Sequence, residues 1–196
     1  MFFLFFFFFR VEIVDIFLYL TAENVPKLLY SNEQRVGLKT FHCCRFKSSA
    51  FRTNQWRYRG SCDSIKFSVS QRIFLTAIGL FGSSNGSHEY KVDIEIKLQN
   101  ITIHEEQTTF QSNGTSSVFS VPLCGNPVKI DSNIIHTLSL TIQGTELSYF
   151  GQDGMSFVKV VPGLTFHFYA SPESTNGTGI QGGQIAELHF YCPAIK

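Results

Sequence analysis

The sequence predicts an all-β protein, a two-sheet antiparallel β-sandwich that is preceded by a short helical N-terminal segment. After residue 41, apolar residues occupy every second position in several runs, and in residues 90–98 they alternate with Lys, Asp and Glu. This two-residue period is typical of strands that bury one face. Breaks that contain Gly, Asn or Pro separate the runs at short spacing, as in antiparallel sandwiches and barrels. The chain has 196 residues, of which 43% are apolar, and this is enough to bury one core.

The chain begins with a Phe-rich run, residues 1–10, in which nine apolar residues precede Arg10. Nine residues of helix rise about 13.5 Å, whereas the bilayer core is about 30 Å thick. The run also lacks the basic start and the small-residue cleavage site of a secretory signal. We interpret it as an artefact or a disordered tail, with a secretory signal and a membrane anchor as the alternatives.

Residues 11–40 are expected to form a helical segment and a linker. Val11, Val14 and Leu18 follow the i, i+3, i+7 spacing of a helix face, which predicts a helix within residues 11–30. The polar residues 31–40 that follow are typical of a linker. The β domain is therefore expected to span residues 41–193.

Five runs within this domain predict strands. Residues 73–81 are apolar on both faces, as expected of a central strand that is covered on both sides. Apolar and polar residues alternate in the other four, which are residues 65–69, 90–98, 138–142 and 164–168. The alternation changes phase after Leu98, to Ile101 and Ile103. A turn at Gln99 and Asn100 explains this change, because Asn tolerates positive φ.

Charge and cysteine content narrow the function classes. The net charge is only +1, so no overall field attracts the chain to nucleic acid or to an anionic membrane. The five cysteines are an odd number, and none of them forms a C-x-x-C pair. This pattern indicates reduced thiols in a reducing compartment, and we expect a cytoplasmic protein.

Two glycine-containing motifs resemble enzyme signatures but lack the structural context that the chemistry needs. Residues 82–86 match G-x-S-x-G with Ser84 as the nucleophile, but that elbow leads into a helix and a strand is predicted here. Residues 177–182 match the dinucleotide fingerprint G-x-G-x-x-G, but no βαβ unit surrounds them. Both motifs are interpreted as loops, and no catalytic residue is expected.

The histidines and cysteines do not form a recognised metal motif. The six histidines include no H-x-H or H-x-x-x-H pair. His42, Cys43 and Cys44 are adjacent, but successive residues of a strand point to opposite faces and cannot surround one ion. Neither a metal nor a cofactor is therefore expected.

A basic segment interleaved with aromatic residues has three interpretations. Its basic residues are Arg45, Lys47, Arg52, Arg57 and Arg59. Structural cation–π packing is preferred, and a protein-binding rim is the second interpretation. Binding to single-stranded nucleic acid is the third, and the nearly neutral charge of the chain argues against it.

Three stretches together resemble one known family. They are residues 45–67, with the segment Trp-Arg-Tyr-Arg-Gly, residues 146–155, and residues 174–185, with Ser-Thr-Asn-Gly-Thr-Gly. They are similar to the PHR domain that closes the BTB–BACK–PHR proteins and that also occurs in giant Highwire-type ubiquitin ligases. The resemblance covers roughly residues 43–192, and residues 11–30 resemble the end of a BACK region.

The resemblance implies a β-sandwich without a catalytic centre that serves as a protein-interaction module. In that family the BTB part binds a cullin scaffold and the PHR part is thought to hold the substrate. The printed sequence contains no BTB domain before the match, so a cullin partner is expected only if a BTB domain lies upstream. A secreted lectin or adhesion domain is the alternative, for which the N-x-S/T sequons at Asn85 and Asn176 would be glycosylated.

Partner binding is expected at loops, because the strands use their side chains in the core. Loops 82–87 and 174–183 are rich in glycine and small polar residues. The candidate contact residues are Ser83, Ser84, Asn85, Ser174, Thr175, Asn176, Thr178, Gln181, Arg57 and Arg59. Trp56, the only tryptophan, is expected to be buried and structural.

Overall fold

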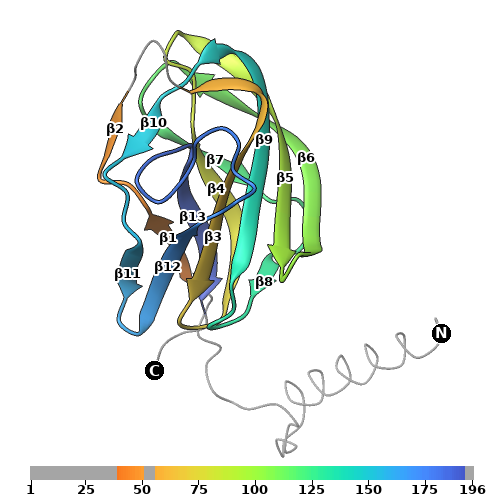
Figure 1. The fold of residues 1–196 in the computed structure, drawn as a ribbon, viewed down its shortest axis with the longest axis vertical. Coiled ribbons are helices and arrows are strands. Elements are labelled where there is room, and N and C mark those ends of the chain that lie inside the picture. Colours follow the sequence, from red (N-terminus) through yellow and green to blue (C-terminus); the bar gives the residue numbers. More distant parts are fainter. Residues whose placement is uncertain (1–38, 51–55, 193–196) are drawn as a thin grey trace, which may run out of the picture. The chain divides into compact units, whose positions relative to one another are not determined.

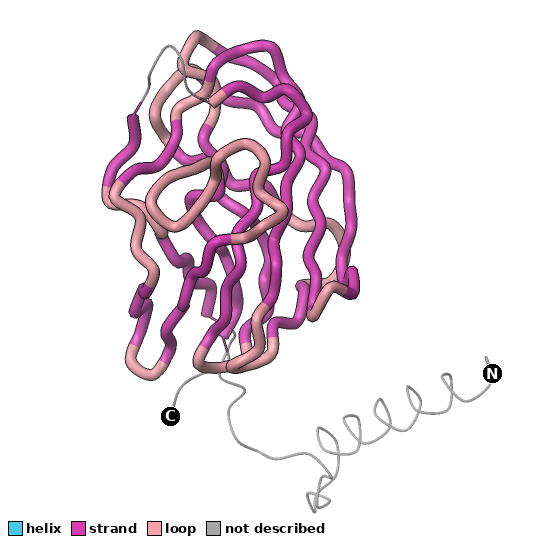
Figure 2. The backbone as a smooth tube through the Cα atoms, viewed as in Figure 1, coloured by secondary structure: helices cyan, strands magenta, loops and turns pink. Residues whose placement is uncertain are grey.

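The structure is a computed structural model that describes residues 39–50 and 56–192, which belong to one compact unit, Leu38–Lys196. All regular elements in these residues are strands (Figure 2). No membrane-spanning helix occurs in this part of the chain. The Phe-rich run, the helix predicted within residues 11–30 and most of the predicted linker lie outside the described residues.

The strands form two large antiparallel sheets and one small one (Figure 1). The first sheet has six strands in the order β11 (Phe157–Val161), β12 (Leu164–Ala170), β3 (Arg57–Val69), β9 (His136–Leu147), β5 (Ser87–Leu98) and β6 (Ile101–Asn113). The second contains β1 (Lys39–Cys44), β13 (Ile185–Cys192), β4 (Ile73–Phe81) and β7 (Val118–Pro122), and β8 (Val128–Ile130) also pairs with β4. The small sheet joins β2 (Ser48–Ala50) to β10 (Phe150–Gln152).

The core lies between the two large sheets, which therefore form a β-sandwich. Phe166 on β12 and Phe190 on β13 are fully buried, and their ring centroids are 5.2 Å apart across the interface. On β5 and β12 one face is buried, as the two-residue period predicts. On β3 and β9 polar residues of the other face, such as Ser64 and Ser139, are buried as well. The all-β fold with antiparallel sheets is confirmed for the described residues.

The hairpin between β5 and β6 explains the change of phase in the sequence. Leu98 pairs with Ile101, and Gln99 and Asn100 form the two-residue turn with φ of 49° and 69°. Both φ values are positive, which is the conformation expected of a type I′ hairpin turn.

Ile101 and Ile103 do not continue the buried face, although they are apolar. Their exposed fractions are 70% and 38%. β6 is the edge strand of its sheet, and the buried residues Phe110 and Ser112 lie near its far end. A register shift between Ile96 and Lys97 also interrupts the pairing before the turn. Hydrophobic alternation alone cannot reveal that an edge strand is covered along only part of its length.

Candidate interaction surface

The first candidate loop, residues 82–87, is attached to the segment that joins β9 to β10. Ser83 forms an isolated β-bridge with Ser148. The backbone N–H of Ser84 donates to the carbonyl of Leu147 at 2.9 Å, and the N–H of Tyr149 donates to the carbonyl of Gly82 at 3.0 Å. These backbone hydrogen bonds fix the loop against residues 147–149.

The second candidate loop, residues 174–183, is attached to the same segment. Gln184 directly follows this loop and is fully buried. Its Nε2 donates to Ser148 Oγ at 2.6 Å and to the carbonyl of Tyr149 at 2.7 Å. Figure 1 shows the second loop in blue between β12 and β13, in the upper half of the domain. The structure therefore brings both candidate loops together around residues 147–149.

Asp63 holds the second loop in place from the interior of the domain. Its carboxylate is fully buried and accepts hydrogen bonds from Trp56 Nε1 at 3.2 Å, Asn176 Nδ2 at 2.9 Å and Thr178 Oγ1 at 2.5 Å. The backbone of the preceding residue, Cys62, exchanges three further hydrogen bonds with Thr175 and Asn176. Burial raises the pKa of the Asp63 carboxyl, and the three neutral donors oppose this effect only in part.

Arg45 anchors the other end of the same loop. Its guanidinium is fully buried and donates to the carbonyls of Ile185 at 2.8 Å and Gly179 at 2.6 Å. The guanidinium also lies 4.7 Å from the ring centroid of Phe46 and 5.0 Å from that of Phe168. Burial lowers the pKa of Arg45 to about 9, so the side chain remains protonated at neutral pH. The cation–π packing expected for the basic segment is thus present at this residue.

Glycines allow the second loop to lie directly on the segment that follows β10. A Cβ at Gly154 would be 1.8 Å from the carbonyl oxygen of Ile180, and a Cβ at Gly183, where φ is 145°, would be 2.3 Å from Thr178 Oγ1. Gly151 and Gly183 also exchange two backbone hydrogen bonds. Larger residues at these positions would separate the two segments, so the glycines are architectural.

The candidate contact residues differ in exposure. Asn85, Thr175 and Gln181 are exposed, and Ser84, Ser174 and Asn176 are half-buried. Ser83 and Thr178 are buried. Arg57 and Arg59 lie on β3, at its bulged end beside β9, but their side chains are outside the described part of the structure.

Ser84 and Trp56 make structural contacts rather than contacts that would support catalysis. Ser84 Oγ donates to the carbonyl of Leu147 at 2.9 Å, and the segment after it is strand β5, so the context of a nucleophile elbow is absent. Trp56 is half-buried rather than fully buried, and it stacks on Phe150 with ring centroids 4.9 Å apart. Its backbone φ is 54°. Trp56 is therefore structural, as predicted, but less buried than predicted.

Sequence reasoning missed the roles of Asp63 and Arg45, although a signal was present. Asp63 falls on the same alternate positions of β3 as the core residues Ile65 and Phe67, and Arg45 follows Cys43 in the same way. A charged residue on the apolar phase of a strand indicates a buried polar anchor. The three stretches that carry the family resemblance supply the two anchors, the glycine segment and the loop, so together they form one continuous structure.

Known proteins are similar to this chain over the residues that form the sheets and the candidate loops. Residues 44–191 match the family model described as the PHR domain. The chain is 51% identical to BTB/POZ domain-containing protein 6-B of Danio rerio, over 92% of this chain and 37% of that protein. It is 48% identical to BTB/POZ domain-containing protein 6 of Homo sapiens and 47% identical to BTB/POZ domain-containing protein 3 of Mus musculus, over 92% of this chain and 33% and 34% of those proteins.

The chain thus spans about a third of the length of these curated relatives. The match to the family model covers both candidate loops and the strands of the two large sheets, except for most of β1. The chain belongs to the PHR domain family.

Proposed function

We propose that this domain binds a protein partner through the surface that loops 82–87 and 174–183 form around residues 147–149. The observation that carries the proposal is the match of residues 44–191 to the PHR domain, which the chain shares with BTB/POZ domain-containing proteins. The convergence of both loops on one segment supports a single surface rather than two separate ones.

The anchoring of the second loop supports a role in recognition. Asp63 and Arg45 hold the loop from the inside, while Thr175 and Gln181 remain exposed on the outside. A loop that is already ordered loses little conformational freedom when a partner binds, so more of the contact energy becomes affinity. Exposed polar residues on a rigid scaffold are typical of binding surfaces.

At a finer level, we propose a cytoplasmic, non-catalytic module that recognises a substrate for a cullin ubiquitin ligase. The BTB/POZ domain in the names of the relatives supports this, because in the family that this chain resembles the BTB part is the one that binds the cullin. The cullin role therefore depends on a BTB domain encoded upstream of this chain. Purification of the longest transcript product from cells tests this point. A cullin that co-purifies with it is expected, and absence of a cullin from a product that contains a BTB domain would refute the ligase role.

The binding surface is tested by a variant that keeps the hydrogen bonds of Asp63. Asn85→Ala combined with Gln181→Ala changes two exposed side chains, whereas Asn176→Ala would also remove a hydrogen bond to Asp63. We expect proteins that the wild-type chain captures after cross-linking to be depleted about tenfold or more by the double variant, a loss of about 1.4 kcal/mol of binding. The variant should still unfold in one cooperative transition, which shows that the loss of capture is not a loss of folding.

The matched control is Ser132→Ala combined with Lys159→Ala, two exposed residues near the opposite end of the sandwich. The control should capture the same proteins as the wild type. Equal capture by the wild type, the Asn85/Gln181 variant and the control would exclude these two residues from the surface. In that case Arg57 and Arg59 become the next residues to test.

A further inference from the structure

The outer face of the second sheet carries four side chains of the kinds that bind metal ions. His42 and Cys44 belong to the edge strand β1, and Glu187 and His189 belong to the neighbouring strand β13. The register pairs His42 with His189 and Cys44 with Glu187. Residues two apart in a strand share a face, so the four side chains form a two-by-two array.

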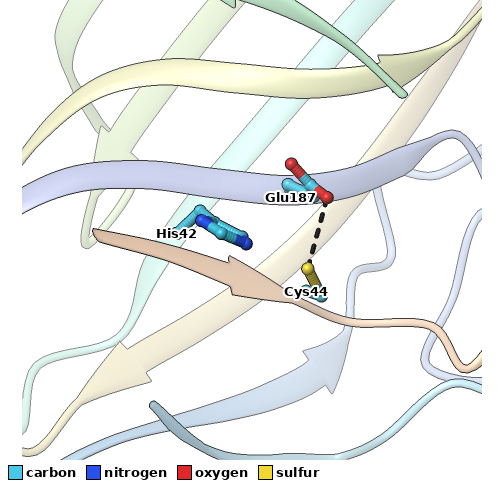
Figure 3. A group of neighbouring side chains, drawn as sticks. All are labelled: His42, Cys44 and Glu187. Atoms are coloured by element: carbon cyan, nitrogen blue, oxygen red, sulfur yellow. Dashed lines mark hydrogen bonds between the residues drawn. The ribbon is translucent and has the colours of Figure 1, made fainter. Parts of the chain in front are cut away.

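Three of these side chains converge (Figure 3). One ligand atom from each of His42, Cys44 and Glu187 lies within 4.8 Å of the other two. Cys44 Sγ donates to Glu187 Oε1 at 3.2 Å, which Figure 3 shows as a dashed line. The other carboxylate oxygen, Oε2, lies 2.9 Å from His189 Nε2.

We propose that His42, Cys44 and Glu187 bind a divalent transition-metal ion, and that Zn²⁺ fits these ligands best. Nitrogen, sulfur and carboxylate oxygen are the three ligand types that zinc takes from proteins. Bonds of about 2.0–2.3 Å place neighbouring ligands of a tetrahedral ion about 3.3–3.8 Å apart. Side-chain rotation would have to bring the atoms, which now lie within 4.8 Å of one another, into that range.

His189 acts as a positioning residue in this site. It holds Glu187 Oε2 at 2.9 Å, so that Oε1 faces Cys44. Hydrogen bonds from a second layer of residues commonly fix the orientation of metal ligands in this way. The ring of His189 also lies beside that of His42, with centroids 5.8 Å apart.

Strand β4 leaves room for the side chain of Glu187. Gly79 is the register partner of Glu187, and a Cβ at this position would lie 2.7 Å from the Cβ of Glu187. Cys44 and Glu187 also line a hollow of about 220 Å³, which Lys47 and Ser48 line as well. A water molecule in this hollow can supply the fourth ligand. The positive charge of Lys47, which lines the same hollow, repels the ion.

Binding of the ion replaces a proton. Without the ion, the Cys44 thiol carries the proton that it donates to Glu187 Oε1. The zinc ion forms a bond to the sulfur, the S–H bond breaks, and the proton passes to solvent. The cation then occupies the position of the proton between Cys44 and Glu187.

Cobalt is the probe for this site, because a Co²⁺–thiolate bond produces a near-ultraviolet charge-transfer band. We expect titration of the whole chain with Co²⁺ to produce this band and one equivalent of Zn²⁺ to abolish it. Cys44→Ser should remove the band, and His42→Ala should weaken Co²⁺ binding about tenfold or more. His42 is exposed, so its replacement should not affect folding.

The matched controls are Cys124→Ser, another cysteine beside a glutamate, and His167→Ala, another exposed histidine on a strand. Both should retain the band and the affinity of the wild type. Zn²⁺ should also raise the thermal midpoint of the wild type and of both controls, but not that of Cys44→Ser. Absence of the band in the wild type, or its persistence at unchanged affinity in Cys44→Ser, would overturn the proposal.

Discussion

The core between the sheets and the end that carries the candidate loops are stabilised in different ways. In the core, aromatic and aliphatic side chains from many strands share the burial, and Phe166, for example, contacts Phe67, Phe168 and Phe190. At the loop end, two buried charged residues, Asp63 and Arg45, hold a segment without regular structure through hydrogen bonds. Stability is therefore distributed in the core and concentrated on a few polar contacts at the loop end.

The largest loss of stability is expected from a core substitution. Phe166→Ala should lower the free energy of unfolding by about 3–5 kcal/mol, because it removes a fully buried ring and leaves a cavity between the sheets. Urea denaturation followed by circular dichroism measures this loss. Exposed Phe157→Ala on β11 is the matched control and should lose much less. Equal losses for the two variants would mean that the inter-sheet core is not the main source of stability.

A smaller and more local loss is expected at the polar anchor. Asp63→Ala leaves the donors of Trp56, Asn176 and Thr178 without their acceptor, which should cost about 2–3 kcal/mol. Hydrogen exchange should increase in loop 174–183 while β4 remains protected. The control is Glu105→Ala, an exposed carboxylate. Uniform loss of protection in β4 and in the loop would show that the anchor belongs to the core.

The same contrast explains how much of the molecule the sequence predicts. The strands are predicted because their alternation is local, as in residues 90–98, where each buried residue lies two positions from the next. The partners of the anchors are not predicted, because Asp63 and Thr178 are 115 residues apart and Arg45 and Ile185 are 140 residues apart. No local pattern encodes such pairs. The family resemblance locates the segments that meet but does not reveal which side chains join them.

The candidate metal ligands follow the same rule. The sequence shows His42 and Cys44 two residues apart, and it shows Glu187 and His189 in the same arrangement. Only the pairing of β1 with β13 places the two pairs side by side. The expectation that no metal binds considered only ligands that lie within a few residues of one another in the chain, whereas a cross-strand site joins distant segments.

The loop end should also differ from the core in the pH dependence of its stability, because it contains Asp63. The change in unfolding free energy with pH is expected to be smaller than the loss caused by Asp63→Ala. The folded-state pKa of Asp63 is raised, so the folded state holds this proton more tightly than the unfolded state, where the pKa is about 3.9. The stabilising contribution of Asp63 is complete below about pH 4 and is lost as the pH rises through the folded-state pKa. The difference in unfolding free energy between the wild type and Asp63→Asn should decrease over that interval.

Other carboxyl groups require the comparison with Asp63→Asn. The pKa values of Glu95 and Asp131 are lowered by hydrogen bonds and by nearby lysines, so their contributions change in the opposite direction. These groups are present in both proteins and cancel in the difference. A difference that stays constant or increases from pH 4 to pH 7 would contradict a raised pKa for Asp63.

A still smaller loss of unfolding free energy is expected when Trp56, which contacts both Asp63 and Phe150, is replaced. Trp56→Phe removes one hydrogen bond to Asp63 but retains an aromatic ring that can stack on Phe150. The carboxylate keeps its bonds from Asn176 and Thr178, so the free energy of unfolding should fall by only about 1 kcal/mol. Thermal unfolding followed by circular dichroism measures this change. A loss as large as that of Asp63→Ala would mean that the indole N–H is the principal partner of the carboxylate.

The smallest loss of unfolding free energy is expected in loop 82–87, because backbone hydrogen bonds provide most of its contacts with residues 147–149. Ser84→Ala removes the hydrogen bond from Oγ to the carbonyl of Leu147, but the backbone N–H of Ser84 still donates to that same oxygen. The carbonyl therefore keeps a partner, and the bridge between Ser83 and Ser148 is unaffected. We expect a loss of about 0.5 kcal/mol, at the low end for one hydrogen bond.

Comparison of Ser84→Ala with Thr178→Val tests whether the two loops are held differently. Thr178→Val removes a hydroxyl that donates to the buried Asp63 and accepts from the N–H of Gln184, so its loss should be about 2 kcal/mol. Chemical denaturation of both variants under one set of conditions gives the two values. If Ser84→Ala is as damaging as Thr178→Val, the first loop also depends on a side-chain anchor. If both losses are small, the second loop is held by its backbone and its glycines, and Asp63 is not the anchor that its three hydrogen bonds indicate.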